Sequence, residues 1–168
     1  MARKLFAVFR TAIVAPLFIS IWTWFLPRWF GGPNAFDGQR PAAWIVVALG
    51  AAIALPCMWQ FAWRGLGTPL PLDPPRKLVV SGPYRFVRNP MYVGMMVVII
   101  GLGLVFPNIT RGMLIEAAAF WGAAALVVLA FEEPVLRSMF DGDYEQYRAA
   151  VPRWIPRLAP WYAPPHLE

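Results

Sequence analysis

The stretch NPMYVGMMVVIIGLGLVFPNIT, residues 89–110, contains no charged side chain. A helix needs about 20 consecutive apolar residues to cross the hydrocarbon core of a bilayer, and this stretch reaches that length. Three further stretches do so as well: residues 5–26, residues 41–63, and residues 112–131, where Glu116 is the one interruption. The sequence therefore predicts an all-α, polytopic membrane helical bundle with about four transmembrane helices.

The composition favours the same class. Apolar residues make up 59% of the 168 residues and charged residues 14%, whereas an ordinary soluble domain has about 45–50% and about 25%. Nine Trp, twelve Phe and five Tyr suit long membrane–water interfaces. The fifteen Lys and Arg residues lie between the apolar blocks instead of forming a basic stripe, so we expect membrane lipids and no nucleic acid as partners.

The basic residues also predict an orientation. Twelve of the fifteen fall on one side of the predicted bilayer, and Arg28, Arg40 and Arg111 fall on the other. Basic residues concentrate on the cytoplasmic side, so both termini and the loop before residue 89 are expected in the cytoplasm. A cleavable signal peptide is the alternative interpretation of residues 5–26, but that stretch is too long and no small-residue cleavage site follows it.

Metal and disulfide chemistry is not expected. The chain has one cysteine, Cys57, inside an apolar run, and one histidine, His166, near its end. A single residue of each type excludes a Cys/His zinc site and a disulfide within the chain.

The loop before the third span, residues 81–94 with the sequence SGPYRFVRNPMYVG, is a candidate binding segment. Asn89 suits the N-cap of a helix and Pro90 its first position. A helix N-terminus carries free amide groups and a partial positive charge, so beside Arg85 and Arg88 it can bind an anionic group. The alternative is a plain helix start flanked by cytoplasmic arginines.

Two adjacent carboxylates, Glu132 and Glu133, follow the fourth span. Consecutive helical residues point about 100° apart, so one can face a ligand while the other pairs with an arginine. Pro134 lacks an amide hydrogen and clashes with the preceding turn, which predicts a kink there. The alternative is that both carboxylates are simply solvated at the membrane surface.

An amphipathic pattern follows the kink. Apolar residues recur every three to four positions from Leu136 to Val151, with charged residues between them and a possible break at Gly142. Tyr144 and Tyr147 share one face of this predicted helix, where they are either core residues or part of a pocket wall.

The order of these segments resembles a known family. The block GPYRFVRNPMYVG at residues 82–94, the Glu132–Glu133 pair, the Tyr144 and Tyr147 segment and the sequence VPR at 151–153 occur together in the integral-membrane methyltransferases. That family includes isoprenylcysteine carboxyl methyltransferase and phosphatidylethanolamine N-methyltransferase. The sequences GLGTP at 65–69 and LDPP at 72–75 resemble its bacterial members, and the likeness covers residues 45–157.

The resemblance implies methyl transfer from S-adenosyl-L-methionine to a lipophilic or small acceptor: an isoprenoid or prenylcysteine-like carboxylate, a phospholipid amine or a thiol. It divides one membrane domain into N-terminal spans on the substrate side (1–64), a cofactor region (65–157) and a proline-rich tail (158–168). The implied catalytic residues are Arg88, Glu132 and Arg153. The implied cofactor-binding residues are Tyr84, Arg88, Asn89, Pro90, Tyr92, Gly94, Glu132, Glu133, Tyr144 and Tyr147.

The chain departs from the family pattern in three places. Asn89 stands where the family often has a histidine, which argues against an obligatory imidazole base. Asp141 follows Phe140 where the family usually has glycine. The glycine pair of the phospholipid enzymes has two alternative counterparts here, Gly50 with Ala48 or Gly65 with Gly67.

Two other functions stay open from the sequence. Membrane sterol reductases, which use a nicotinamide cofactor, share a related architecture, but they are usually longer and this chain shows no additional phosphate-binding segment. The second alternative is a catalytically silent membrane protein that keeps the motifs for structural reasons. The sequence does not specify the acceptor, the oligomeric state or the residue that accepts a proton.

Overall fold

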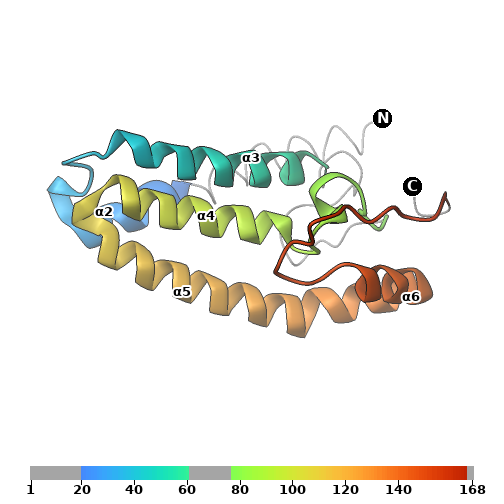
Figure 1. Cartoon of the computed structure of the whole chain (residues 1–168). Helices are drawn as coiled ribbons and strands as arrows, with labels where there is room; N and C mark the ends of the chain where they lie inside the picture. The colour runs from blue at the N-terminus through green and yellow to red at the C-terminus, as the bar shows by residue number, and fades with distance from the viewer. Residues whose placement is uncertain (1–19, 61–76, 166–168) are drawn as a thin grey trace, which may run out of the picture.

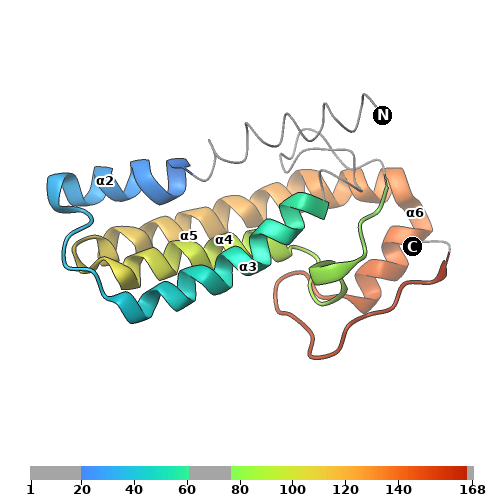
Figure 2. The same ribbon diagram turned by 90° about the horizontal axis from the view of Figure 1, so that it is seen from above.

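The computed structural model describes residues 20–60 and 77–165. Within these ranges the chain forms helices and no strand, which confirms the all-α prediction. Three long helices lie side by side: α3 (Trp44–Gln60), α4 (Pro90–Val105) and α5 (Thr110–Val127) (Figure 1). The amphipathic helix α6 (Glu133–Ala150) continues from α5 beyond the ends of α3 and α4. The short α2 (Leu26–Gly31) lies at the opposite end (Figure 2).

Among the described residues, two helical segments are long and apolar enough to cross a membrane. They are Pro41–Gln60 and Pro107–Ala150, while α4 is apolar but shorter. The second and fourth predicted spans fall on these two segments, and the third falls on α4. Of the first predicted span, residues 5–19 lie outside the described part of the chain.

Glycines bring α3 and α4 into backbone contact. A Cβ atom added to Gly50 would lie 2.7 Å from the Gly94 carbonyl oxygen, and one added to Gly94 would lie 2.8 Å from the Ala54 amide nitrogen. Helices associate closely in membranes where small residues line the interface. The buried apolar cluster that α4 and α5 share includes Ile99, Val105 and Met113, none of them more than 1% exposed.

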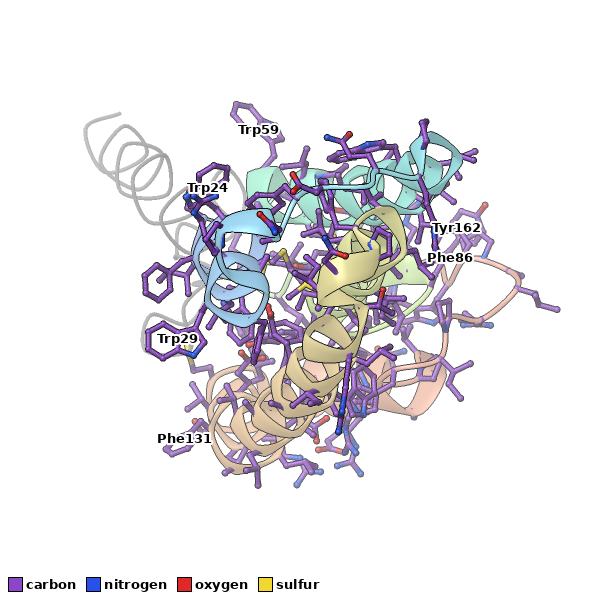
Figure 3. The ribbon with its side chains drawn as sticks, turned by 90° about the vertical axis from the view of Figure 1, so that its left-hand side faces the viewer. Trp24, Trp29, Trp59, Phe86, Phe131 and Tyr162 are labelled. Atoms are coloured by element: carbon purple, nitrogen blue, oxygen red, sulfur yellow. The ribbon has the colours of Figure 1, made fainter. Side chains whose placement is uncertain are left out.

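Large apolar side chains cover the outside of the bundle. Figure 3 shows Trp24, Trp29, Trp59 and Phe131 pointing away from it, and each is at least 59% exposed. In water such a surface would be costly, whereas lipid tails solvate it. Glu116 on α5 is buried inside the bundle, and neither of its oxygens has a hydrogen-bond partner among residues 20–60 and 77–165.

A π-helical turn (Val128–Glu132) joins α5 to α6 directly before Glu133 and Pro134, and the Glu133 amide donates to the Val128 carbonyl five residues back. Wider turns of this kind occur frequently at functional sites. The break inside α6 lies at Asp141, where φ is 39° and ψ is −118°, one residue before the predicted position.

Candidate functional site

Glu133 is the centre of a charged network. Arg88 donates from Nη1 to Glu133 Oε1 at 2.8 Å, and Arg153 donates from Nε to Oε1 at 2.6 Å and from Nη2 to Oε2 at 3.0 Å. The Glu133 side chain is 7% exposed and that of Arg88 is 9% exposed. Charge-assisted hydrogen bonds of this kind are short and strong. Both arginines are therefore committed to one carboxylate.

This network controls the ionisation of Glu133. Burial alone would raise the pKa of the Glu133 carboxyl, but the hydrogen bond from Arg153 and the two positive charges outweigh burial, so the pKa lies below its ordinary value. The same hydrogen bond raises the pKa of Arg153. The pair is thus fully charged at neutral pH.

The two tyrosines of α6 connect this helix to the loop before α4. Arg88 Nη1 lies 3.1 Å from the Tyr144 hydroxyl, and the Tyr147 hydroxyl donates to the Tyr84 carbonyl at 2.8 Å. Both α6 tyrosines are buried in a small core with Val80 and Val151. Burial raises the pKa of the Tyr147 hydroxyl, which keeps it a neutral donor. Tyr144 and Tyr147 therefore belong to the hydrophobic core, and their hydroxyl groups belong to the polar network.

Glu132 faces a different partner from Glu133. Its Oε1 accepts a hydrogen bond of 2.5 Å from the Tyr92 hydroxyl of α4. Within the described residues this is the one hydrogen bond to Glu132, whose side chain is half-buried. The prediction that one of the two carboxylates pairs with arginine is confirmed for Glu133. Glu132 is left as the carboxylate with an oxygen available to a ligand.

Asn89 differs from its predicted role. It occupies the N-cap position of α4, and Pro90 begins the helix as predicted, but the Asn89 side chain makes no cap hydrogen bond. Its amide instead donates to the Arg153 carbonyl at 3.1 Å. This hydrogen bond replaces the local cap, and it links the start of α4 to the C-terminal segment that contains Arg153.

The C-terminal segment after α6 completes the site. The amide of Arg88 donates to the Pro152 carbonyl, that of Arg157 to the Phe86 carbonyl, and that of Trp161 to the Arg85 carbonyl, all within 3.0 Å. Figures 1 and 2 both show this segment turning back toward the start of α4. It therefore runs along the loop of residues 85–88 and carries Arg153 to Glu133.

Most of the predicted site residues come together at this end of the bundle, but Gly94 does not. It faces α3 at the contact with Gly50, where its small size permits helix packing. Of the two alternative glycine pairs, Gly50 belongs to the same helix contact, while Gly65 and Gly67 lie outside the described residues.

Two aromatic residues near the site were not predicted. The Trp154 ring lies 4.5 Å from the Trp121 ring of α5 and 6.4 Å from the Tyr92 ring, measured between centroids. Trp154 directly follows the VPR sequence, and this position next to a family motif could have indicated that it lies near the site. No pattern in the sequence connects it with Trp121, which lies 33 positions away in an apolar helix.

Comparison with known proteins gives one family and three relatives. A family model described as phospholipid methyltransferase matches residues 39–143. Protein-S-isoprenylcysteine O-methyltransferase of Schizosaccharomyces pombe is 35% identical over 48% of this chain and 34% of its own length. Methanethiol S-methyltransferase 2 of Bradyrhizobium diazoefficiens is 37% identical over 45% of this chain and 27% of its own length.

The third relative is the nickel-cobalt-cadmium resistance protein NccN of Alcaligenes xylosoxydans xylosoxydans, 31% identical over 49% of this chain and 38% of its own length. The matched segment thus spans roughly a third of each relative. In the described part of this chain, no group of three or more His, Cys, Asp or Glu side chains is placed to hold a metal ion. No solved structure matches the chain.

Proposed function

Because the chain belongs to the phospholipid methyltransferase family, we propose that it transfers a methyl group from S-adenosylmethionine to a lipophilic or small acceptor at the cytoplasmic face of the membrane. The observation that carries this proposal is that two adjacent carboxylates have different partners. Glu133 is neutralised by Arg88 and Arg153, while Glu132 keeps an oxygen for a ligand.

The residues present fit a cofactor that has an ammonium group, a carboxylate and ribose hydroxyls. Glu132 can accept hydrogen bonds from the ribose hydroxyls or the ammonium group. Arg88 Nε is buried and has no hydrogen-bond partner in the described part of the chain, so one donor of this guanidinium is unpaired there. Buried donors normally find a partner, and an anionic group of the ligand would supply one.

The chain's own work in this reaction is binding and orientation. A bound sulfonium supplies an already activated methyl group, so no protein nucleophile is needed. Arg88, Glu133 and Arg153 fix the loop before α4, the start of α6 and the C-terminal segment relative to one another. Such fixed geometry, together with exclusion of water, is how a protein accelerates an in-line transfer.

The acceptor is proposed as a class. The relatives' names specify a prenylated cysteine and methanethiol, and the family name a phospholipid, so carboxylate, thiol and amine acceptors all belong to the proposal. An apolar acceptor would enter from the lipid between helices, while the polar cofactor arrives from the cytoplasm.

The proposed arrangement in the membrane has four spans, with residues 5–26 as the first. Both termini, the site and α6 lie on the cytoplasmic side, and the protein resides in the bacterial inner membrane. The charge distribution supports this orientation, since twelve of the fifteen Lys and Arg residues lie in the two terminal segments, the loop before α4 and α6.

Calorimetry on the full chain in detergent tests the proposal. We expect saturable binding of S-adenosylmethionine and S-adenosylhomocysteine, and no binding of NADPH. Glu132→Gln should weaken binding of both by about tenfold or more, because a hydrogen bond to a charged group is lost. Glu145→Gln, at an exposed glutamate on α6, is the matched control and should bind normally. Binding of NADPH alone would support the reductase instead, and binding of none of the three by folded protein would overturn the proposal.

A further inference from the structure

Beside the charged network lies a surface on which aromatic rings meet a carboxylate. We refer to Tyr92, Trp121, Glu132 and Trp154 together as the aromatic–acid surface. Trp154 contacts the rings of Trp121 and Tyr92, and the Tyr92 hydroxyl donates to Glu132. All four side chains are half-buried, so each is packed against the protein and still presents part of its surface.

The electrostatics of this surface favour a cation. The faces of aromatic rings carry a negative potential that attracts positive charge. Arg88 and Arg153 carry two positive charges beside this surface, and the carboxylates of Glu133 and Glu132 balance them, so the faces of the rings supply the preference for a cation. Glu132 adds a formal negative charge next to Tyr92. A positively charged group is the ligand that all four side chains favour.

Trp154 is held in place by contacts on the residues before it. The Arg153 guanidinium binds Glu133 through two hydrogen bonds, and the Arg153 carbonyl accepts one from Asn89. The Pro152 carbonyl accepts a further hydrogen bond from the Arg88 amide. A ring fixed in this way is preorganised, which reduces the entropy lost when a ligand binds.

We propose that Trp154 and Trp121, with Tyr92 and Glu132, form a binding site for a positively charged, methyl-bearing onium group. That group is either the sulfonium of the methyl donor or an ammonium on the acceptor. The inference rests on the proposed function and assigns to Trp154 and Trp121 a role in distinguishing charged from neutral ligands.

The two sources of positive charge can be separated by matched ligand pairs. S-adenosylmethionine carries a sulfonium and S-adenosylhomocysteine a neutral thioether. Dihexanoyl phosphatidylcholine carries a quaternary ammonium that dihexanoyl phosphatidylglycerol lacks. Dissociation constants for all four would be measured by calorimetry on the full chain in phosphatidylglycerol nanodiscs. A cation on aromatic faces is expected to give a preference of about two- to thirtyfold for the charged member of a pair.

Trp154→Leu is the decisive variant, because it keeps an apolar side chain and removes the ring. In Trp154→Leu the ratio of the two dissociation constants within a pair should fall close to one, while Trp154→Phe should retain part of the preference. Trp29→Leu removes an exposed indole from α2 at the other end of the bundle and should leave the preference unchanged. Thermal unfolding of each variant confirms that it is folded.

A Trp154-dependent preference for S-adenosylmethionine over S-adenosylhomocysteine identifies the sulfonium as the ligand. A Trp154-dependent preference for the phosphatidylcholine over the phosphatidylglycerol identifies the ammonium. Equal affinities within both pairs would overturn this inference while leaving the proposed function intact. So would a preference that survives Trp154→Leu, or that falls equally in Trp29→Leu. Absence of any binding of the two adenosyl ligands to the unmodified protein would instead count against the proposed function.

Discussion

Arg153 binds both carboxylate oxygens of Glu133, at 2.6 and 3.0 Å, although twenty residues separate the two in the sequence. Arg88, 45 residues before Glu133, shares one of these oxygens. One carboxylate therefore joins the loop before α4, the start of α6 and the C-terminal segment.

Replacing Glu133 with Gln should destabilise the protein substantially. The change leaves two positive charges without their counter-ion, and breaking a buried ion pair by removing one partner costs about 3 kcal/mol or more. The control is Glu145→Gln, whose carboxylate pairs with Arg137 and Arg148 on the exposed surface. Exposed pairs contribute about 1 kcal/mol or less, so thermal unfolding in detergent should show a clearly lower midpoint for Glu133→Gln only. Equal midpoints would contradict the structural role of the network.

Stability should fall in acid because of the same residue. The pKa of Glu133 is lowered from its ordinary value of about 4.5, so its stabilising effect is complete above that value and is lost as the pH falls through the lowered pKa. Unfolding midpoints measured between pH 7 and pH 3 should therefore fall at the acidic end. The Glu133→Gln variant should show a weaker dependence over this window. Parallel curves for the two proteins would assign the acid sensitivity to other groups.

Asp141→Gly should stabilise the protein. Asp141 has φ 39° and ψ −118°, a region that glycine adopts readily and other residues adopt at a cost of about 1–3 kcal/mol. The methyltransferase family that the sequence resembles usually has glycine at this position. Gln146→Gly provides the comparison, because this exposed residue lies in regular helix, where glycine costs about 1 kcal/mol. Chemical or thermal unfolding should move in opposite directions for the two variants, and a loss of stability in both would show that Asp141 is not strained.

Gly94→Ala should weaken the contact between α3 and α4. The added Cβ would lie 2.8 Å from both the Ala54 amide nitrogen and the Gly50 carbonyl oxygen, so the helix backbones must separate. Gly122→Ala on α5 places its Cβ in open space and should be neutral or slightly stabilising. Comparing unfolding midpoints of the two variants separates packing from helix propensity. A tolerated Gly94→Ala would mean that the helices can shift without cost.

The orientation in the membrane gives a further prediction. With Cys57 replaced by Ala, single cysteines would be introduced at two exposed positions: Asp37, between α2 and α3, and Ser138, in α6. Helices α2 and α6 lie at opposite ends of the bundle (Figure 2). A membrane-impermeant maleimide should label Asp37→Cys in intact spheroplasts and Ser138→Cys only after lysis. The reverse pattern would invert the proposed topology.

Local patterns in the sequence were enough to predict the helical class, the helix starting at Pro90 and an arginine partner for one of the two carboxylates Glu132 and Glu133. Apolar run length, proline position and helical geometry depend on neighbouring residues alone. The side-chain bond of Asn89 and the pairing of Trp154 with Trp121 could not be predicted, because both depend on where the irregular C-terminal segment folds. The π-helical turn before Glu133 also has no sequence signature.

The return of the C-terminal segment to the loop before α4 has a consequence for biosynthesis. Ribosomes make Arg88 first, then Glu133, and Arg153 twenty residues later, so the site cannot close while α5 is being inserted. Until Arg153 emerges, the Glu133 carboxylate has one of its two arginine partners, and water must satisfy the rest. Insertion of the helices and assembly of the site are therefore separate events in time, and a stalled or shortened chain would reach the membrane with its helices placed and its site unformed.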